Sequence, residues 1–166
     1  MTVLQAAAEL RAKKLSVHEL VQESLDRIAR LDGRVNAFIT VMAQSALARA
    51  RRLDEELAAG VDRGPLHGIP VALKDVFSTR GVRTTCGSRI FADYVPDHDA
   101  AVVERLTGAG AVIVGKTNMH ELAYGITSVN PHYGAVRNPR DPERVAGGSS
   151  GGSAIAVATG MSLGAM

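Results

Sequence analysis

Residues 99–117 read DAAVVERLTGAGAVIVGKT and residues 69–77 read IPVALKDVF; together they decide the fold class. IPVALKDVF is a short, almost continuous apolar run, which is typical of a strand buried on both faces. In the later stretch Asp99 is a predicted helix N-cap, apolar residues repeat at helical spacing, and AVIVGKT supplies a second apolar run. Strand, helix and strand in this order predict a parallel pair joined by a right-handed crossover, and therefore an α/β core.

The residues before this core predict a helical arm, residues 1–62, which belongs to the same domain as residues 63–166. Helical periodicity places helices at about residues 3–13, 16–33 and 41–59. Ser16 and Glu19 have the spacing of a capping box, and Gly33 is the predicted end of that helix. We expect the arm to cover the core without carrying chemistry.

Composition narrows the function classes. A chain of 166 residues with 46% hydrophobic and 22% charged residues is typical of one ordinary globular domain. The net charge of +2 is small and the basic residues are dispersed, so we expect no nucleic-acid partner. The start of the chain lacks a signal-peptide pattern, and no 18-residue apolar run exists, so we expect a cytoplasmic protein with no membrane contact. The single cysteine, Cys86, fits a reducing compartment.

One motif points to a different class of function. Gly110–Thr117 satisfies G-x-x-x-x-G-K-T, the pattern of a phosphate-binding loop. The four intervening residues are Ala-Val-Ile-Val, which favour a strand, and a strand commits its N–H groups to a sheet rather than to phosphate. A P-loop nucleotide-binding module is therefore an alternative that we do not favour.

The sequence predicts neither a metal nor a cofactor. HELAY, residues 120–124, begins like a zinc-protease helix but has Tyr124 where the second histidine must stand. DHD, residues 97–99, is better interpreted as a helix cap with neighbouring surface charge. Cys86 has no basic neighbour in sequence, so we interpret it as a small buried residue rather than a nucleophile.

Two features remain as candidates for chemistry. Lys74 ends the apolar run IPVAL, and burial there would lower its pKa enough to make it a base near neutral pH. The alternative is a lysine whose head reaches solvent or pairs with Asp75. GGSSGGSAIAVATG, residues 147–160, could be a linker, an anion cradle or part of a catalytic site; its small residues suit a helix packed closely on the sheet. Residues 125–150 predict an extended, looping segment.

Four blocks, in this order, resemble the N-terminal part of the amidase signature family. They are GIPVALKDVFSTRGVRTTCGS, DAAVVERLTGAGAVIVGKTNMHELAYG, NPHYGAVRNPRDPERV and GGSSGGSAIAVATG, and they span roughly residues 64–160. The Gly-Ser block alone would not be specific, but the linked set is. The resemblance implies the family's fold: a helical arm followed by part of a mixed, largely parallel sheet flanked by helices.

The resemblance also implies a Ser–Ser–Lys triad that hydrolyses a carboxamide. Lys74 occupies the lysine position of the block G-x-P-x-x-x-K-D, and Ser149 occupies the bridging serine, which a cis peptide bond precedes. Neutral Lys74 would take a proton through Ser149 from the nucleophilic serine, which attacks the amide carbonyl. We expect Ser149 Oγ to lie within hydrogen-bond reach of the Lys74 amine.

This chain departs from the family pattern in one important respect. The family's nucleophile and oxyanion groups belong to a later block, G-T-D-T-G-G-S, which the 166 residues do not contain. We therefore interpret residues 63–166 as the N-terminal part of the family's core and expect the chain alone to be inactive. Smaller departures are Arg140, where the family often has Trp, and Ala146, where it often has Pro.

The resemblance leaves two related functions open. The first is a free amidase acting on a small-molecule amide; the alternative is the A subunit of a glutamyl/aspartyl-tRNA amidotransferase, which deamidates glutamine and works with partner subunits. HELAYGITSVNPHYG, residues 120–134, resembles simple amidases more, so we favour the amidase. The substrate and the oligomeric state stay open.

Overall fold

The computed structural model describes residues 1–166 and is built around a four-stranded sheet. Its order is β1 (Phe38–Val41), β3 (Val112–Thr117), β2 (Pro70–Lys74) and β8 (Gly164–Ala165). The pairs β2–β3 and β2–β8 are parallel, and β1 pairs antiparallel with β3. The expected mixed, largely parallel sheet is confirmed.

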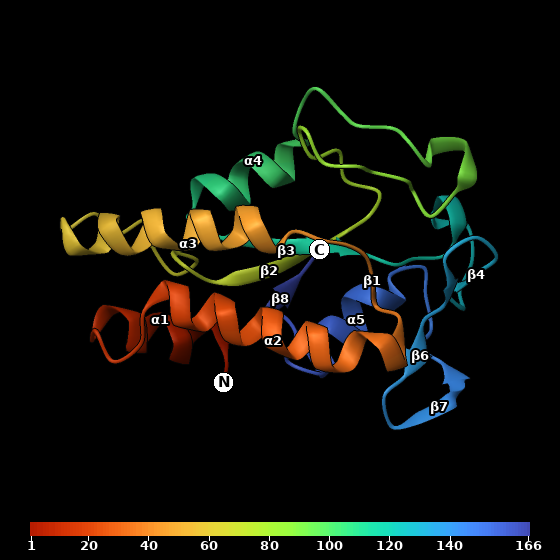
Figure 1. Ribbon diagram of the computed structural model, residues 1–166, viewed down its shortest axis with the longest axis horizontal. Helices are drawn as coiled ribbons and strands as arrows, with labels where there is room; N and C mark the ends of the chain where they lie inside the picture. The colour runs from red at the N-terminus through yellow and green to blue at the C-terminus, as the bar shows by residue number, and fades with distance from the viewer.

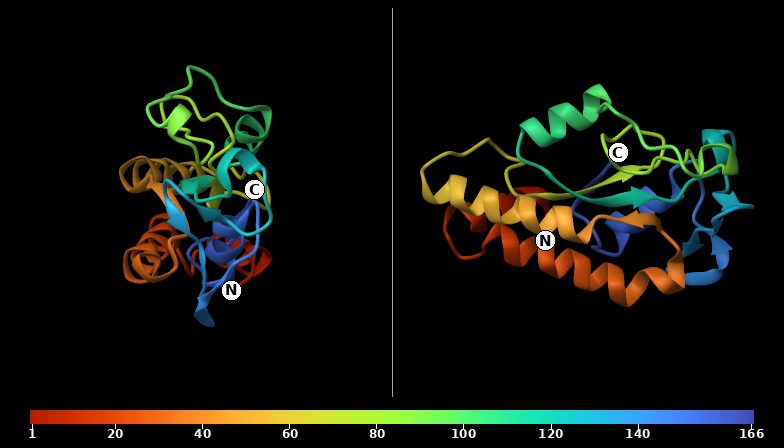
Figure 2. Two further views of the ribbon diagram at one scale, coloured as in Figure 1. Left: turned by 90° about the vertical axis from the view of Figure 1, so that its right-hand side faces the viewer. Right: turned by 45° about the horizontal axis from the view of Figure 1, so that its top comes forward.

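Helices cover the two faces of this sheet. Figures 1 and 2 show α3 (Ala43–Ala58) and α4 (Ala101–Gly108) on one face, and α1 (Val3–Arg11), α2 (Val17–Val35) and α5 (Gly151–Ala158) on the other. A single cluster of 27 buried apolar residues takes members from the N-terminal helices and from the strands. The helical arm thus shares its core with the sheet.

The first helices follow the predicted pattern, with one correction. Ser16 Oγ accepts a hydrogen bond from the Glu19 N–H, and the Glu19 side chain accepts from the Ser16 N–H, so the capping box is confirmed. Gly33 does not end α2, which continues to Val35 and is capped by Asn36 in the left-handed conformation (φ 55°). One internal glycine costs a helix only about 1 kcal/mol, which packing offsets, and asparagine tolerates the left-handed cap.

Strand β1 was not predicted from the sequence. It has four residues, and its pairing with β3 is interrupted by an irregularity between Phe38 and Thr40. Only Phe38 of the strand is fully buried, so no period-2 pattern distinguishes these residues from the helices beside them.

The central strand–helix–strand unit forms as expected. Every residue of β2 and of β3 is buried, and the two strands are parallel neighbours. The predicted N-cap of α4 is wrong: the cap position is Ala100, and no side chain caps the helix. Asp99 instead accepts a hydrogen bond from the Arg80 N–H (2.7 Å), so it fastens the preceding loop.

The remaining segments are short. Residues 125–150 contain two small antiparallel pairs, β4 (Val129–Asn130) with β5 (Gly134–Ala135) and β6 (Arg137–Asn138) with β7 (Asp141–Val145). Two 3-10 turns, η1 (Arg89–Phe91) and η2 (Glu121–Ala123), complete the chain. None of the helices combines the length and the apolar character needed to span a membrane.

Candidate active site

Lys74 lies at the carboxyl end of β2, and the residue is only 8% exposed in the folded chain. Its Nζ donates a hydrogen bond to Ser149 Oγ at 2.6 Å, within the range expected from the sequence. Burial lowers the pKa of the Lys74 ammonium from its usual value of 10.5, because desolvation disfavours the charged form. The alternative pairing of Lys74 with Asp75 does not occur, since Asp75 pairs with another lysine.

Ser149 lies in the loop that connects β7 to α5. The peptide bond between Gly148 and Ser149 is cis, as the family resemblance implied. The Ser149 carbonyl accepts a hydrogen bond from the His120 N–H (3.1 Å), so the segment that follows β3 holds the loop from one side. Residues 74 and 149 are far apart in sequence, and this arrangement brings their side chains together.

Helix α5 packs on the sheet through its glycines. The Gly152 N–H donates to the Asn118 carbonyl (3.0 Å), and a Cβ at Gly152 would overlap the carbonyl oxygens of Ala37 and Asn118. The expected close packing of this small-residue helix is confirmed, and the glycine-rich stretch is therefore not a linker.

Ser153 has a structural environment. Its Oγ donates to the Met166 carbonyl (3.1 Å) and lies 2.8 Å from Thr117 Oγ1, in a buried position. Because its single proton is used by the Met166 carbonyl, Thr117 is the donor in the second bond. The hydroxyl is thus held between α5 and the strand ends, which gives no support to Ser153 as a nucleophile.

The other face of the same strand ends carries a buried ion pair that sequence reasoning missed. Lys116 Nζ lies 3.1 Å from Asp75 Oδ1, and both side chains are completely buried. The ammonium donates hydrogen bonds to Thr84 Oγ1 (2.6 Å) and to the Phe77 carbonyl (2.9 Å), whereas Asp75 Oδ1 faces it as the partner of an ion pair without a hydrogen bond of its own. Asp75 Oδ2 accepts from the N–H and the hydroxyl of Thr85. The sequence shows only that Asp75 and Lys116 each stand at the end of an apolar run.

This environment removes the nucleotide-binding alternative for Gly110–Thr117. The apolar part of the motif forms β3, whose backbone is paired with strands on both sides. Lys116, the motif's lysine, is enclosed by Asp75 and Thr84 and cannot reach a phosphate.

The HELAY segment and Cys86, which the sequence analysis also considered, take no part in the Lys74–Ser149 contact. Glu121 Oε1 accepts from the Ser88 hydroxyl (2.7 Å) and lies 3.0 Å from His132 Nε2, so HELAY joins a surface network. Cys86 is half-buried with φ 52°, and burial raises the pKa of its thiol, so it is a poor nucleophile.

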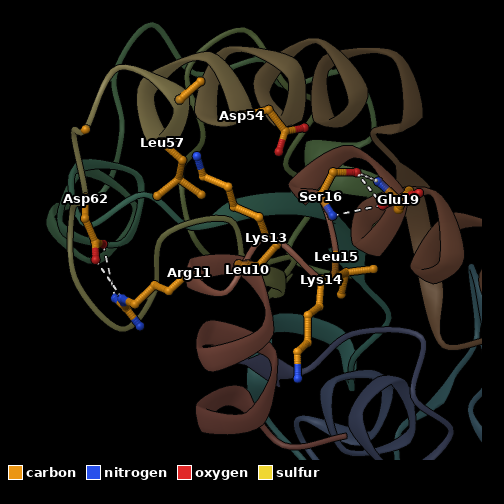
Figure 3. A pocket seen from close by; sticks show the side chains of 12 residues that line it. Leu10, Arg11, Lys13, Lys14, Leu15, Ser16, Glu19, Asp54, Leu57 and Asp62 are labelled. Carbon is orange, nitrogen blue, oxygen red and sulfur yellow. Dashed lines mark hydrogen bonds and ion pairs between the residues drawn. The ribbon is translucent and has the colours of Figure 1, made fainter.

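A pocket of about 540 Å³, which neither Lys74 nor Ser149 lines, lies between α1, the start of α2 and the end of α3 (Figure 3). Several of its polar side chains stabilise the fold. Arg11 pairs with Asp62 at 2.6 Å, which holds the pKa of that carboxyl at about 2, and the Asp54 carboxylate accepts the N–H groups of Val17 and His18 at the start of α2. Lys13 and Lys14 also line the pocket, but its one serine, Ser16, bonds Glu19 in the cap of α2, so the pocket holds no lysine–serine hydrogen bond like that of Lys74 and Ser149.

Comparison with known proteins places the chain in a family. The family model Amidase matches residues 19–166, and the chain belongs to that family. Over 157 residues it is 52% identical to the A subunit of the glutamyl-tRNA(Gln) amidotransferase of Acidothermus cellulolyticus, a match that covers 95% of this chain and 31% of that protein.

Solved structures agree with the fold. Native peptide amidase from Stenotrophomonas maltophilia superposes with a TM-score of 0.92 at 39% identity, over 98% of this chain and 34% of that one. The A subunit of the glutamyl-tRNA(Gln) amidotransferase of Thermotoga maritima superposes with a TM-score of 0.79 at 42% identity, over 99% of this chain and 33% of that one. The chain thus spans about a third of the length of the proteins it matches.

Proposed function

We propose that Lys74 and Ser149 are two members of a Ser–Ser–Lys triad, and that the complete protein hydrolyses a carboxamide. The observation that carries the proposal is the 2.6 Å hydrogen bond from a buried lysine to a serine hydroxyl. A neutral lysine is an effective base, and burial favours the neutral form. Membership of the Amidase family supports the same chemistry.

In the proposed mechanism the relay carries a proton to Lys74 during attack and returns one from Lys74 to the leaving amine. Neutral Lys74 takes the hydroxyl proton of Ser149 while Ser149 takes the proton of the nucleophilic serine, whose oxygen attacks the amide carbon. The lysine then returns a proton through Ser149 to the departing amine, and water hydrolyses the acyl-enzyme. Neither a metal nor a cofactor is required for these steps.

In this proposal the nucleophile is not Ser150 or Ser153. Family resemblance assigns it to a later block of the form G-T-D-T-G-G-S, together with the oxyanion N–H groups. The hydrogen bonds of Ser153 support this assignment, because its hydroxyl is already engaged with the Met166 carbonyl and the Thr117 hydroxyl. The 166 residues would then supply the base and the bridge of the triad.

A second candidate is the glutamine-deamidating component of a tRNA-dependent amidotransferase, its A subunit. The 52% identity to such a protein supports this candidate, whereas the higher TM-score of the peptide amidase supports the free amidase. Both would use Lys74 and Ser149 in the same way, and they differ in substrate and in the need for partner subunits.

Assays on the complete enzyme separate these candidates. We expect hydrolysis of small carboxamides by the purified protein alone, and loss of that activity in Lys74→Ala. Glutamine hydrolysis that appears only with added partner subunits would favour the second candidate. Full activity in Lys74→Ala towards every amide would contradict both.

A further inference from the structure

We infer that Ser128 is a positioning residue for Ser149, acting through the first turn of α5. This inference rests on the proposed function of Ser149. Helix α5 has no capping bond from its own N-cap residue, Ser150. The Oγ of Ser128 accepts the Gly151 N–H instead, at 3.0 Å in a buried environment. The hydroxyl thus fixes the backbone two residues after the proposed bridging serine.

Ser128 is well placed for this task because it is itself held firmly. It is completely buried, and its carbonyl accepts a hydrogen bond from the Val136 N–H (3.0 Å). Its φ is 53°, a left-handed conformation that is uncommon for a residue other than glycine, asparagine or aspartate. Glycine would fit this backbone more easily, so the serine carries a conformational cost that the hydrogen bond from the Gly151 N–H to its hydroxyl can offset.

Ser128 also packs closely against Gly148 and Gly151, the glycines on either side of Ser149. A Cβ added to Gly151 would lie 2.6 Å from Ser128 Oγ and 2.7 Å from Ser128 Cβ. A Cβ added to Gly148 would lie 2.6 Å from Ser128 Oγ and 2.8 Å from the Ser128 backbone nitrogen. Ser128 therefore contacts the backbone on both sides of Ser149, and no side chain can replace either glycine without moving this loop.

This arrangement gives Ser128 a role in turnover. Ser149 Oγ must stay within hydrogen-bond reach of Lys74, and a displacement of about 1 Å can cost on the order of 100-fold in rate. Loss of the Gly151–Ser128 bond leaves the loop held by His120 at Ser149 and by Asn118 at Gly152, but it removes the hydrogen bond that lies between these two attachments. Because Ser128 is completely buried, we expect it not to contact substrate, and KM should change much less than kcat.

The first test measures kcat and KM for Ser128→Ala and Ser128→Gly in the complete enzyme, below the Tm of each variant. Both remove the hydroxyl, but only glycine is free of the strain at positive φ. We expect kcat to fall by roughly 10- to 100-fold in both, with KM little changed. Thr159→Ala, which removes a hydroxyl bond at the other end of α5, is the matched control and should keep normal kcat. A lower Tm with wild-type kcat in both Ser128 variants would overturn the inference.

The second test uses the two glycines and is measured by Tm. Gly151→Ala should lower Tm, and Ser128→Gly in the same chain should restore much of the loss, because it removes both atoms that the new methyl overlaps. Gly148→Ala should not be rescued, because its methyl still meets the backbone nitrogen of residue 128. Equal rescue of both, or of neither, would contradict the contact. This result does not depend on turnover, whereas activity in Lys74→Ala would instead contradict the proposed function.

Discussion

At the scale of single residues, Lys74 is the group on which the proposed chemistry depends. It is a lysine with a buried side chain, a lowered pKa and one hydrogen-bond partner, Ser149. The sequence placed it at the end of a buried strand but could not decide between a base and a lysine paired with Asp75. That decision depends on Lys116, whose position beside Asp75 arises from strand pairing that no local pattern encodes.

The lowered pKa of Lys74 makes a prediction about pH. Lys74 is active as a base only when neutral, so kcat/KM of the complete enzyme should rise with pH through a midpoint below the usual lysine value of 10.5. Lys74→Arg keeps the charge but cannot lose its proton near neutral pH, and should be inactive throughout. A rate that falls as pH rises through this range, or an active Lys74→Arg variant, would rule out the lysine as base.

The buried Asp75–Lys116 pair makes a prediction about stability. Lys116→Met leaves an uncompensated carboxylate and Asp75→Asn leaves an uncompensated ammonium, so each should lower the free energy of unfolding by about 3–5 kcal/mol. The double variant removes both charges and should lose less than the sum of the two. Urea unfolding of the three variants measures this coupling, and additive losses would show that the charges do not depend on each other.

At the scale of elements, the features that the sequence predicted are those that depend on residues close together in the chain. The capping box at Ser16 and Glu19, the buried strands β2 and β3 and the small-residue helix α5 are all specified by residues within the element or directly beside it. The missed features are bonds between distant segments. Asp54 of α3 accepts N–H groups at the start of α2, and Ser128 accepts the first N–H of α5.

Two glycines in helices should respond to alanine in opposite directions. Gly33 lies inside α2 with nothing near its added Cβ, so Gly33→Ala should raise the free energy of unfolding by about 0.5–1 kcal/mol. Gly152 lies against the carbonyl oxygens of Ala37 and Asn118, so Gly152→Ala should destabilise the protein by displacing α5. Thermal unfolding of both variants checks the pair; stabilisation by Gly152→Ala would mean that α5 is not packed this closely.

At the scale of the whole molecule, the sheet brings together residues from three separate segments. Lys74 ends β2, His120 follows β3, and Ser149 precedes α5, and hydrogen bonds join all three. The four sequence blocks predicted this convergence only through the family resemblance. Residue spacing alone could not, because it does not specify which loops meet at the carboxyl ends of the parallel strands.

The proposed division of the triad predicts how residues 1–166 behave alone. With the base and the bridge but without the family's nucleophile block, the isolated chain should show no amide hydrolysis, since loss of even one oxyanion donor costs about 10²–10³ in rate. It should also resist a serine-directed fluorophosphonate, and mass spectrometry of the treated chain checks this. Stoichiometric labelling of Ser153 would instead make that serine the nucleophile.

The most direct test of the relay is a double-mutant cycle on kcat/KM in the complete enzyme, with Lys74→Ala, Ser149→Ala and the two together. If Lys74 acts through Ser149, either change disables the same proton transfer, and the double variant should be about as slow as the slower single variant. Circular dichroism should show that all three keep the fold. A double variant slower by the product of the two single effects would mean that Lys74 and Ser149 act independently, and the proposed relay would be wrong.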